Sequence, residues 1–83
     1  MTTHHTAVIV DDEPDIRELL EITLGRMGIT TRSAPDVASA KALLSEESPH
    51  LCLTDMNLPD GNGIDLVHWM QEHCPNTPVA VIT

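Results

Sequence analysis

Four short runs rich in β-branched or apolar residues alternate along the chain with three stretches of helical spacing. The runs lie at 7–10 (AVIV), 29–34 (the most polar one), 51–54 (LCLT) and 79–82 (VAVI). A short, continuous apolar run is typical of a strand that is buried on both faces. The order βαβαβαβ therefore predicts one α/β domain: a three-layer αβα arrangement with a parallel sheet, right-handed crossovers and helices on both faces.

The starts and ends of the predicted helices are marked by residues that commonly begin, cap or end a helix. Pro14 stands at a first helical position, and Gly28 is suited to the left-handed conformation that ends a helix. Asp36 can cap a second helix that Ser48-Pro49 ends, and a third helix is expected over 64–73. The positions expected to face the core are Ile16, Leu19, Leu20, Leu24 and Met27 in the first helix and Ile64, Leu66, Val67 and Met70 in the third.

The charge balance excludes several classes of function. Among 83 residues, acidic side chains outnumber basic ones by 13 to 4, which gives a formal charge of −9. Such a chain is a poor partner for nucleic acid phosphates or an anionic membrane surface. No apolar run approaches the ~20 residues of a spanning helix, and no signal-peptide pattern precedes the first strand. We therefore expect a cytoplasmic domain that binds neither nucleic acid nor membrane.

The two cysteines predict neither a disulfide framework nor a strong metal site. Cys52 lies in an apolar run and is expected to be buried, whereas Cys74 is expected at the end of an element. A metal site made from His68, His73 and Cys74 is disfavoured, because the sequence offers no second closely spaced ligand pair to complete it.

Polar residues follow three of the predicted strands. Asp11 and Asp12 follow the first, Asp55 ends the third and Thr83 ends the fourth. In parallel sheets, ligands bind beyond the carboxyl ends of the strands, so these side chains are expected to meet at one edge. Three carboxylates in one crevice would repel each other unless a cation neutralised them, and Mg²⁺ prefers such oxygen ligands. The pattern therefore predicts a magnesium site.

An aspartate beside Mg²⁺ can attack phosphorus and form an acyl phosphate. Asp55 suits that role, and the Thr83 hydroxyl could hydrogen-bond a phosphoryl oxygen. Taken singly, the acids at 11–13 could merely complement a helix dipole, and Asp55 could merely form a turn. Their joint placement favours the functional interpretation. The stretch 58–63 is interpreted as a turn that begins the third helix, in which Asp60 is structural or solvated and not a ligand.

Three segments carry a resemblance to a known family. VIVDDEPDIRELL (8–20), LTDMNLPDGNGIDL (53–66) and PVAVIT (78–83) resemble, in order, a response-regulator receiver domain. The similarity is greatest to NtrC-class receivers and, among these, to regulators of type IV pili. It implies a flavodoxin-like (CheY-like) fold with sheet order 2-1-3-4-5.

The resemblance also implies roles for particular residues. Asp55 would accept a phosphoryl group from a sensor histidine kinase, Met56 would supply a backbone N–H near that group, and Thr83 would be the switch hydroxyl. The implied Mg²⁺ ligands are Asp11 (through water), Asp12, Asp55 and the backbone carbonyl of Asn57. Function would then be a phospho-accepting, non-enzymatic relay to a transcriptional output domain absent from this chain, with type IV pilus genes among the targets that the resemblance suggests.

The sequence also departs from the family pattern. The family continues beyond its fourth strand with a helix, a fifth strand and a fifth helix, whereas this chain stops at Thr83 and lacks the lysine that follows the fifth strand. It also has no Tyr or Phe for the switch aromatic position. Residues 1–83 are therefore expected to be a truncated receiver. Its exposed fourth strand, 79–82, is expected to favour a homodimer or a swapped dimer.

Other functions fit the sequence less well. A non-phosphorylated interaction or dimerisation module of the same fold remains the alternative. An aspartyl phosphatase would need a second acid two residues beyond Asp55, where the sequence has Asn57. A flavin-binding module is disfavoured because the loop after the first strand is acidic, where a phosphate site would offer N–H groups and hydroxyls.

Overall fold

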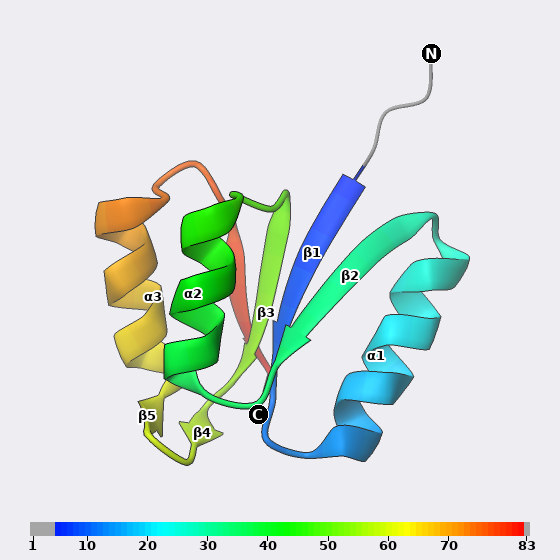
Figure 1. The fold of residues 1–83 in the computed structure, drawn as a ribbon, viewed down its shortest axis with the longest axis horizontal. Coiled ribbons are helices and arrows are strands. Elements are labelled where there is room, and N and C mark those ends of the chain that lie inside the picture. The colour runs from blue at the N-terminus through cyan, green and yellow to red at the C-terminus, as the bar shows by residue number, and fades with distance from the viewer. Residues whose placement is uncertain (1–4, 83) are drawn as a thin grey trace.

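A computed structural model describes residues 5–82 of the chain. The helices are α1 (Pro14–Arg26), α2 (Val37–Glu46) and α3 (Gly63–His73), and the strands are β1 (His5–Val10), β2 (Ile29–Ala34), β3 (Leu51–Asp55), β4 (Asn57–Leu58), β5 (Gly61–Asn62) and β6 (Val79–Ile82) (Figure 1). Within that range, no helix is both long enough and apolar enough to cross a membrane.

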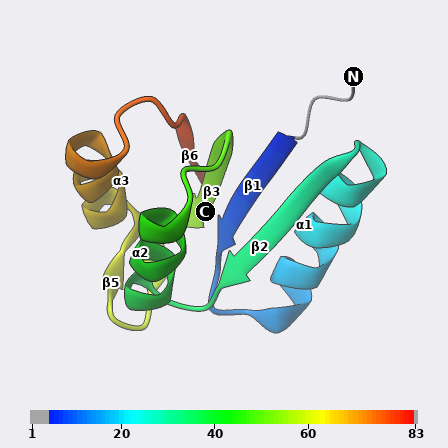
Figure 2. The same ribbon diagram turned by 45° about the horizontal axis from the view of Figure 1, so that its top comes forward.

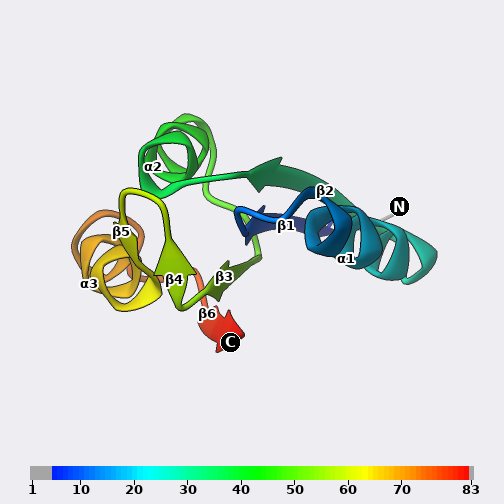
Figure 3. The same ribbon diagram turned by 90° about the horizontal axis from the view of Figure 1, so that it is seen from below.

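Four parallel strands form the central sheet in the order β2-β1-β3-β6 (Figure 2). Figure 3 shows α2 and α3 on one side of this sheet and α1 on the other. The predicted three-layer α/β architecture is therefore confirmed. β4 and β5 form a separate two-stranded sheet, so β6 is the fourth strand of the central sheet, and the strand order matches the first four places of the expected 2-1-3-4-5 order. All the crossovers bring the carboxyl ends of the strands to one edge, at the bottom of Figure 1.

The sheet separates two hydrophobic cores, and β1 contributes to both. Val8 and Val10 are buried in the core beneath α2 and α3. Ala7 and Ile9 are buried on the opposite face, where they pack with Leu24 of α1. Alternate residues of a strand point to opposite faces, so a strand covered on both sides needs a continuous apolar run. This is why the run at 7–10 has no polar member.

The helix boundaries follow the signals expected from the sequence. Pro14 is the first residue of α1, and Gly28 takes a positive φ of 81° just after that helix ends. The Asp36 carboxylate accepts a hydrogen bond from the Ser39 backbone N–H at 2.7 Å, which is the expected N-cap of α2. Cys74 is the C-cap residue of α3, at the end of an element as predicted.

Three apolar residues expected to face the core are exposed instead. Leu19 and Met27 are 59% and 68% exposed, and Ile64 is 41% exposed. In α1 only the strip containing the buried Leu24 faces the sheet, and Met27 lies beyond the last helical residue. Ile64 precedes the buried Leu66 by two residues, which places it about 200° away around the helix. The predicted helices are present, but the face of each helix that packs against the sheet is narrower than predicted.

Candidate functional site

Three aspartates meet at the carboxyl edge of the sheet. β1 and β3 are neighbouring parallel strands whose register pairs Val10 with Thr54, so the residues that follow each strand emerge together. One carboxylate oxygen from each of Asp11, Asp12 and Asp55 lies within 4.8 Å of the others. Among the described residues, no other group of three His, Cys, Asp or Glu side chains is this close. The three aspartates that were expected to meet at this edge therefore lie together.

The loop after β1 holds Asp11 firmly. Its side chain is buried, at 5% exposure, and its Oδ1 accepts a hydrogen bond from the Glu13 backbone N–H at 2.9 Å. The Asp11 backbone N–H donates to the Ala34 carbonyl of β2 at 3.1 Å, and the Asp11 carbonyl accepts from Arg17 Nη1 at 2.7 Å. Asp12 is exposed beside it. One acid is therefore anchored, and the next is open to solvent.

Asp55 is the last residue of β3 and is half-buried. Its register partner in β6 is Ile82, so the acid stands between the two neighbouring strand ends. Its Oδ1 accepts a hydrogen bond from the Met56 backbone N–H at 2.8 Å. This N–H is the one that the family resemblance assigns to the phosphoryl group, and in this structure it already points at the carboxylate.

A short hairpin follows Asp55. β4 and β5 pair in antiparallel fashion, with Asn57 opposite Asn62, and the Gly63 backbone N–H donates to the Met56 carbonyl at 2.8 Å. The sequence predicted a turn here but not its strand pairing. Asn57, whose carbonyl is the expected fourth metal ligand, is the exposed first residue of this hairpin.

The acidic cluster opens into a hollow of about 210 Å³. Its lining residues are Asp11, Glu13, Ile16, Asp55 and Ile82. Carboxylate oxygens grouped at an open surface are the donors that Mg²⁺ prefers, and the remaining space leaves room for water and a phosphate oxygen. The residues present therefore fit a magnesium ion. Thr83, the predicted switch hydroxyl, lies outside the described residues; its neighbour Ile82 borders the hollow.

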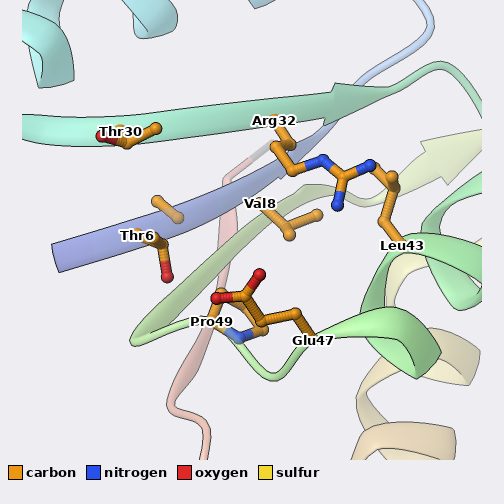
Figure 4. A pocket seen from close by; sticks show the side chains of 8 residues that line it. Thr6, Val8, Thr30, Arg32, Leu43, Glu47 and Pro49 are labelled. Carbon is orange, nitrogen blue, oxygen red and sulfur yellow. The ribbon is translucent and has the colours of Figure 1, made fainter. Parts of the chain in front are cut away.

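A second hollow lies at the opposite end of the sheet, near the starts of β1 and β2 (Figure 4). It measures about 230 Å³, and its lining residues are Thr6, Ala7, Val8, Thr30, Arg32, Leu43, Glu47 and Pro49. None of the residues predicted to act on phosphate or metal borders it.

Asp60 is structural, as predicted, but its partners are far away in the sequence. Its two carboxylate oxygens accept hydrogen bonds from the backbone N–H groups of Val37 at 2.8 Å and Ala38 at 3.0 Å. These two bonds hold the pKa of Asp60 below its usual value. A turn composition such as Pro59-Asp60-Gly61 signals a local bend and carries no information about a helix 22 or 23 residues earlier.

Comparison with known proteins places this geometry in a family. Residues 7–83 match the response regulator receiver domain. The chain is 66% identical over 77 residues to the response regulator protein PilR of Pseudomonas aeruginosa, a match that covers 93% of this chain and 17% of PilR. It is 32% identical over 75 residues to the DNA-binding transcriptional regulator NtrC of Proteus hauseri, covering 90% of this chain and 16% of NtrC.

A solved structure of the response regulator MaeR bound to beryllium trifluoride superposes with a TM-score of 0.87 at 33% identity. That match covers 95% of this chain and 66% of MaeR, which confirms the expected CheY-like, flavodoxin-like fold. The chain spans about a sixth of the length of the two curated relatives described above. The matched residues include the three converging aspartates and the strands that carry them. This chain belongs to the response regulator receiver domain family of two-component systems.

Proposed function

We propose that this domain receives a phosphoryl group on Asp55 from a sensor histidine kinase. The observation that carries the proposal is the convergence of Asp11, Asp12 and Asp55 within 4.8 Å at the end of the sheet. Of these three, Asp55 is the half-buried residue at the centre of a strand-end crevice, while its neighbours come from a different loop. The 66% identity to the response regulator PilR, and the likeness to the MaeR response regulator bound to beryllium trifluoride, support a receiver function.

The transfer step follows from the placement of Asp55. A carboxylate oxygen of Asp55 attacks phosphorus while the bond from phosphorus to the donor imidazole nitrogen breaks. The imidazole leaves as the neutral base after protonation, and Asp55 becomes an acyl phosphate. Bound Mg²⁺ supplies charge neutralisation for the phosphoryl oxygens.

The other residues at the edge of the sheet have proposed roles in binding the metal or orienting the phosphoryl group. Asp12 and Asp55 would hold the metal, Asp11 would take part through water, and the Asn57 carbonyl would complete the protein ligands. The Met56 N–H, which donates to Asp55 at 2.8 Å, is placed to donate to a phosphoryl oxygen after transfer. Thr83 is proposed as the switch hydroxyl that responds to the new charge.

The rest of the proposed function concerns partners outside this chain. We propose that residues 1–83 act as a cytoplasmic, non-enzymatic receiver without direct contact to nucleic acid or membrane. The output is transcriptional in the manner of NtrC-class regulators, and the similarity to PilR favours type IV pilus genes. The output domain would lie outside the residues of this chain, which match 17% of PilR.

One observation favours a second candidate function. β6 is an edge strand of the described sheet, and its four residues Val79–Ile82 are apolar. An apolar edge can pair with another chain. The domain would then act as a non-phosphorylated interaction module, forming a homodimer or a swapped dimer through this edge.

Intact mass spectrometry after incubation with acetyl phosphate and Mg²⁺ tests the first proposal. We expect one phosphoryl adduct on the wild type, none on Asp55→Asn, and none when EDTA removes the metal. Asp15→Asn is the matched control, because Asp15 is an acid in the first turn of α1 outside the cluster; it should retain the adduct. An unmodified wild type whose dimerisation is indifferent to Mg²⁺ and donor would instead support the interaction module.

A further inference from the structure

The hairpin that follows Asp55 is fastened to the start of helix α2 by a single carboxylate. Asp60, at the hairpin tip between β4 and β5, accepts the N–H groups of Val37 at 2.8 Å and Ala38 at 3.0 Å. Packing strengthens the same contact, because Leu58 and Val37 are buried in one core, and a β-carbon at Gly61 would lie 3.4 Å from Val37 Cγ2. The hairpin therefore has a fixed position against α2.

Helix α2 already has an N-cap of its own. Asp36 accepts the Ser39 N–H through its side chain at 2.7 Å, and its carbonyl accepts the Ala40 N–H at 3.1 Å. The two N–H groups that Asp60 takes are the first two of the helix, which water satisfies at an ordinary exposed helix end. The contact to Asp60 is thus an addition to a complete cap, and what it adds is a connection between two distant segments.

That connection links the two segments that form the site, which are the loop after β1 and the hairpin after β3. On one side, the Asp11 backbone N–H donates to the Ala34 carbonyl at the end of β2 at 3.1 Å. On the other side, Val37, three residues later, donates to Asp60 of the hairpin. The connection between β2 and α2 therefore holds both the loop that carries Asp11 and the hairpin that begins with Asn57. A displacement of the hairpin tip would change the separation between these two groups.

We propose that Asp60 is a positioning residue for the site at Asp55: by fastening the hairpin to α2, it sets the distance between the Asn57 carbonyl and the carboxylates of Asp11 and Asp12. Asp60 itself contacts neither metal nor phosphoryl group. This inference rests on the proposed function, in which Asn57 and the aspartates share one Mg²⁺. Groups that orient metal ligands without touching the metal change affinity by about 10- to 100-fold when removed.

The experiment measures the Mg²⁺ affinity of the full chain by isothermal titration calorimetry in the wild type and five variants. Asp60→Ala removes the acceptor, and Val37→Pro removes one donor from the opposite partner. Proline is favoured at the first position of a helix, and the preceding Asp36 is already extended, with φ −152° and ψ 173°, so the helix can accept it. Asp36→Ala removes an equal charge at the same helix end, and Val37→Ala removes packing but keeps the N–H.

We expect Asp60→Ala and Val37→Pro each to weaken Mg²⁺ binding by about 10-fold, while Asp36→Ala stays within about 2-fold of the wild type. Val37→Ala loses packing against the hairpin but keeps the N–H, so it should weaken binding less than Val37→Pro. Asp60→Asn keeps one acceptor oxygen and should fall between wild type and Asp60→Ala. Circular dichroism confirms that each variant compared is folded. Equal affinities for Asp60→Ala and Asp36→Ala would overturn the inference, because Asp60 would then be only one more cap of α2.

The acetyl phosphate adduct separates this inference from the proposed function. An adduct on the wild type together with equal Mg²⁺ affinities in Asp60→Ala and Asp36→Ala refutes the positioning role alone. The expected affinity pattern without any adduct on the wild type refutes phosphoryl acceptance and leaves the positioning of the metal site supported.

Discussion

The backbone carbonyl of Asp55 occupies the space that a side chain on Gly63, the first residue of α3, would need. A β-carbon at this glycine would collide with the Asp55 carbonyl oxygen and lie 3.2 Å from Thr54 Cγ2. The start of α3 is thereby pressed onto the end of the strand that presents the acceptor aspartate. The close approach holds the ends of the intervening hairpin together, and it requires a residue without a side chain.

Substitution of Gly63 by alanine should therefore destabilise the fold. The added methyl group has to displace backbone atoms of β3, and overpacking of this kind costs about 1–3 kcal/mol. Gly25→Ala is the matched control: that glycine lies inside α1, a β-carbon there would meet no other group within 4 Å, and alanine should stabilise the chain by about 0.5–1 kcal/mol. Urea unfolding measures both; equal effects of the two substitutions would contradict the close approach.

Local signals predicted most of the scaffold from the sequence. The run at 7–10, Pro14, Gly28 and Asp36 each act on their own neighbours, and each was found in its predicted role. The convergence of the aspartates was also predictable, because parallel strands with right-handed crossovers send consecutive strand ends to one edge. Sequence order alone was therefore enough to bring Asp55 beside residues more than 40 positions earlier.

Features that depend on distant partners were not predictable. Leu19 has the spacing of a core residue, yet it is exposed because it lies off the face of α1 that carries the buried Leu24 toward the sheet. The pairing of Asn57 with Asn62 belongs to a hairpin that contacts α3 and is bonded through Asp60 to the start of α2. Asp60 bonds to N–H groups in another helix, and no property of its own segment identifies them. In each case tertiary packing, rather than local propensity, decides the outcome.

Removal of one acid from the cluster should have opposite effects with and without metal. Asp12→Asn relieves repulsion among three carboxylates, so in EDTA it should raise the free energy of unfolding. With Mg²⁺ at 100 times its Kd, the wild type should gain about 2.7 kcal/mol, and the variant should lose much of this gain at the same concentration because its affinity falls by at least about 10-fold. Thermal unfolding with and without Mg²⁺ measures both effects. Asp15→Asn, outside the cluster, should show neither effect. If Asp12→Asn behaved like Asp15→Asn, the shared cation site would be refuted.

The buried Cys52 thiol should make the fold less stable in alkali. Burial, with a smaller contribution from the nearby Cys74, raises the pKa of Cys52 to about 12. The unfolded chain ionises this thiol near its usual pKa of about 8.5, so between these values the unfolded state holds fewer protons. The free energy of unfolding should fall with rising pH over this window, by up to about 1.4 kcal/mol per pH unit. Urea unfolding at several pH values should give a shallower slope for Cys52→Ala; equal slopes would contradict the burial of the thiol.

Asp60 should make the fold less stable as the pH falls, whereas Cys52 makes it less stable as the pH rises. Its hydrogen bonds from Val37 and Ala38 lower the pKa of the folded state, so the folded chain binds the proton less readily than the unfolded chain. The stability that Asp60 provides is present above the unfolded pKa of about 4 and is lost as the pH falls through the lower folded-state pKa. Asp60→Asn should therefore lose less stability than the wild type on acidification. Parallel acid unfolding curves for the two proteins would show that the carboxylate makes no such contact.

Phosphoryl acceptance by Asp55 can be tested by identifying the carboxylate that carries the phosphoryl group. The chain is incubated with acetyl phosphate and Mg²⁺, the acyl phosphate is reduced with borohydride to the corresponding alcohol, and peptide mass spectrometry locates the resulting homoserine. We predict homoserine at Asp55 alone, with Asp55→Asn giving none. Homoserine at Asp11 or Asp12, or no reduction product above the level of Asp55→Asn, would contradict the assignment of Asp55 as the acceptor.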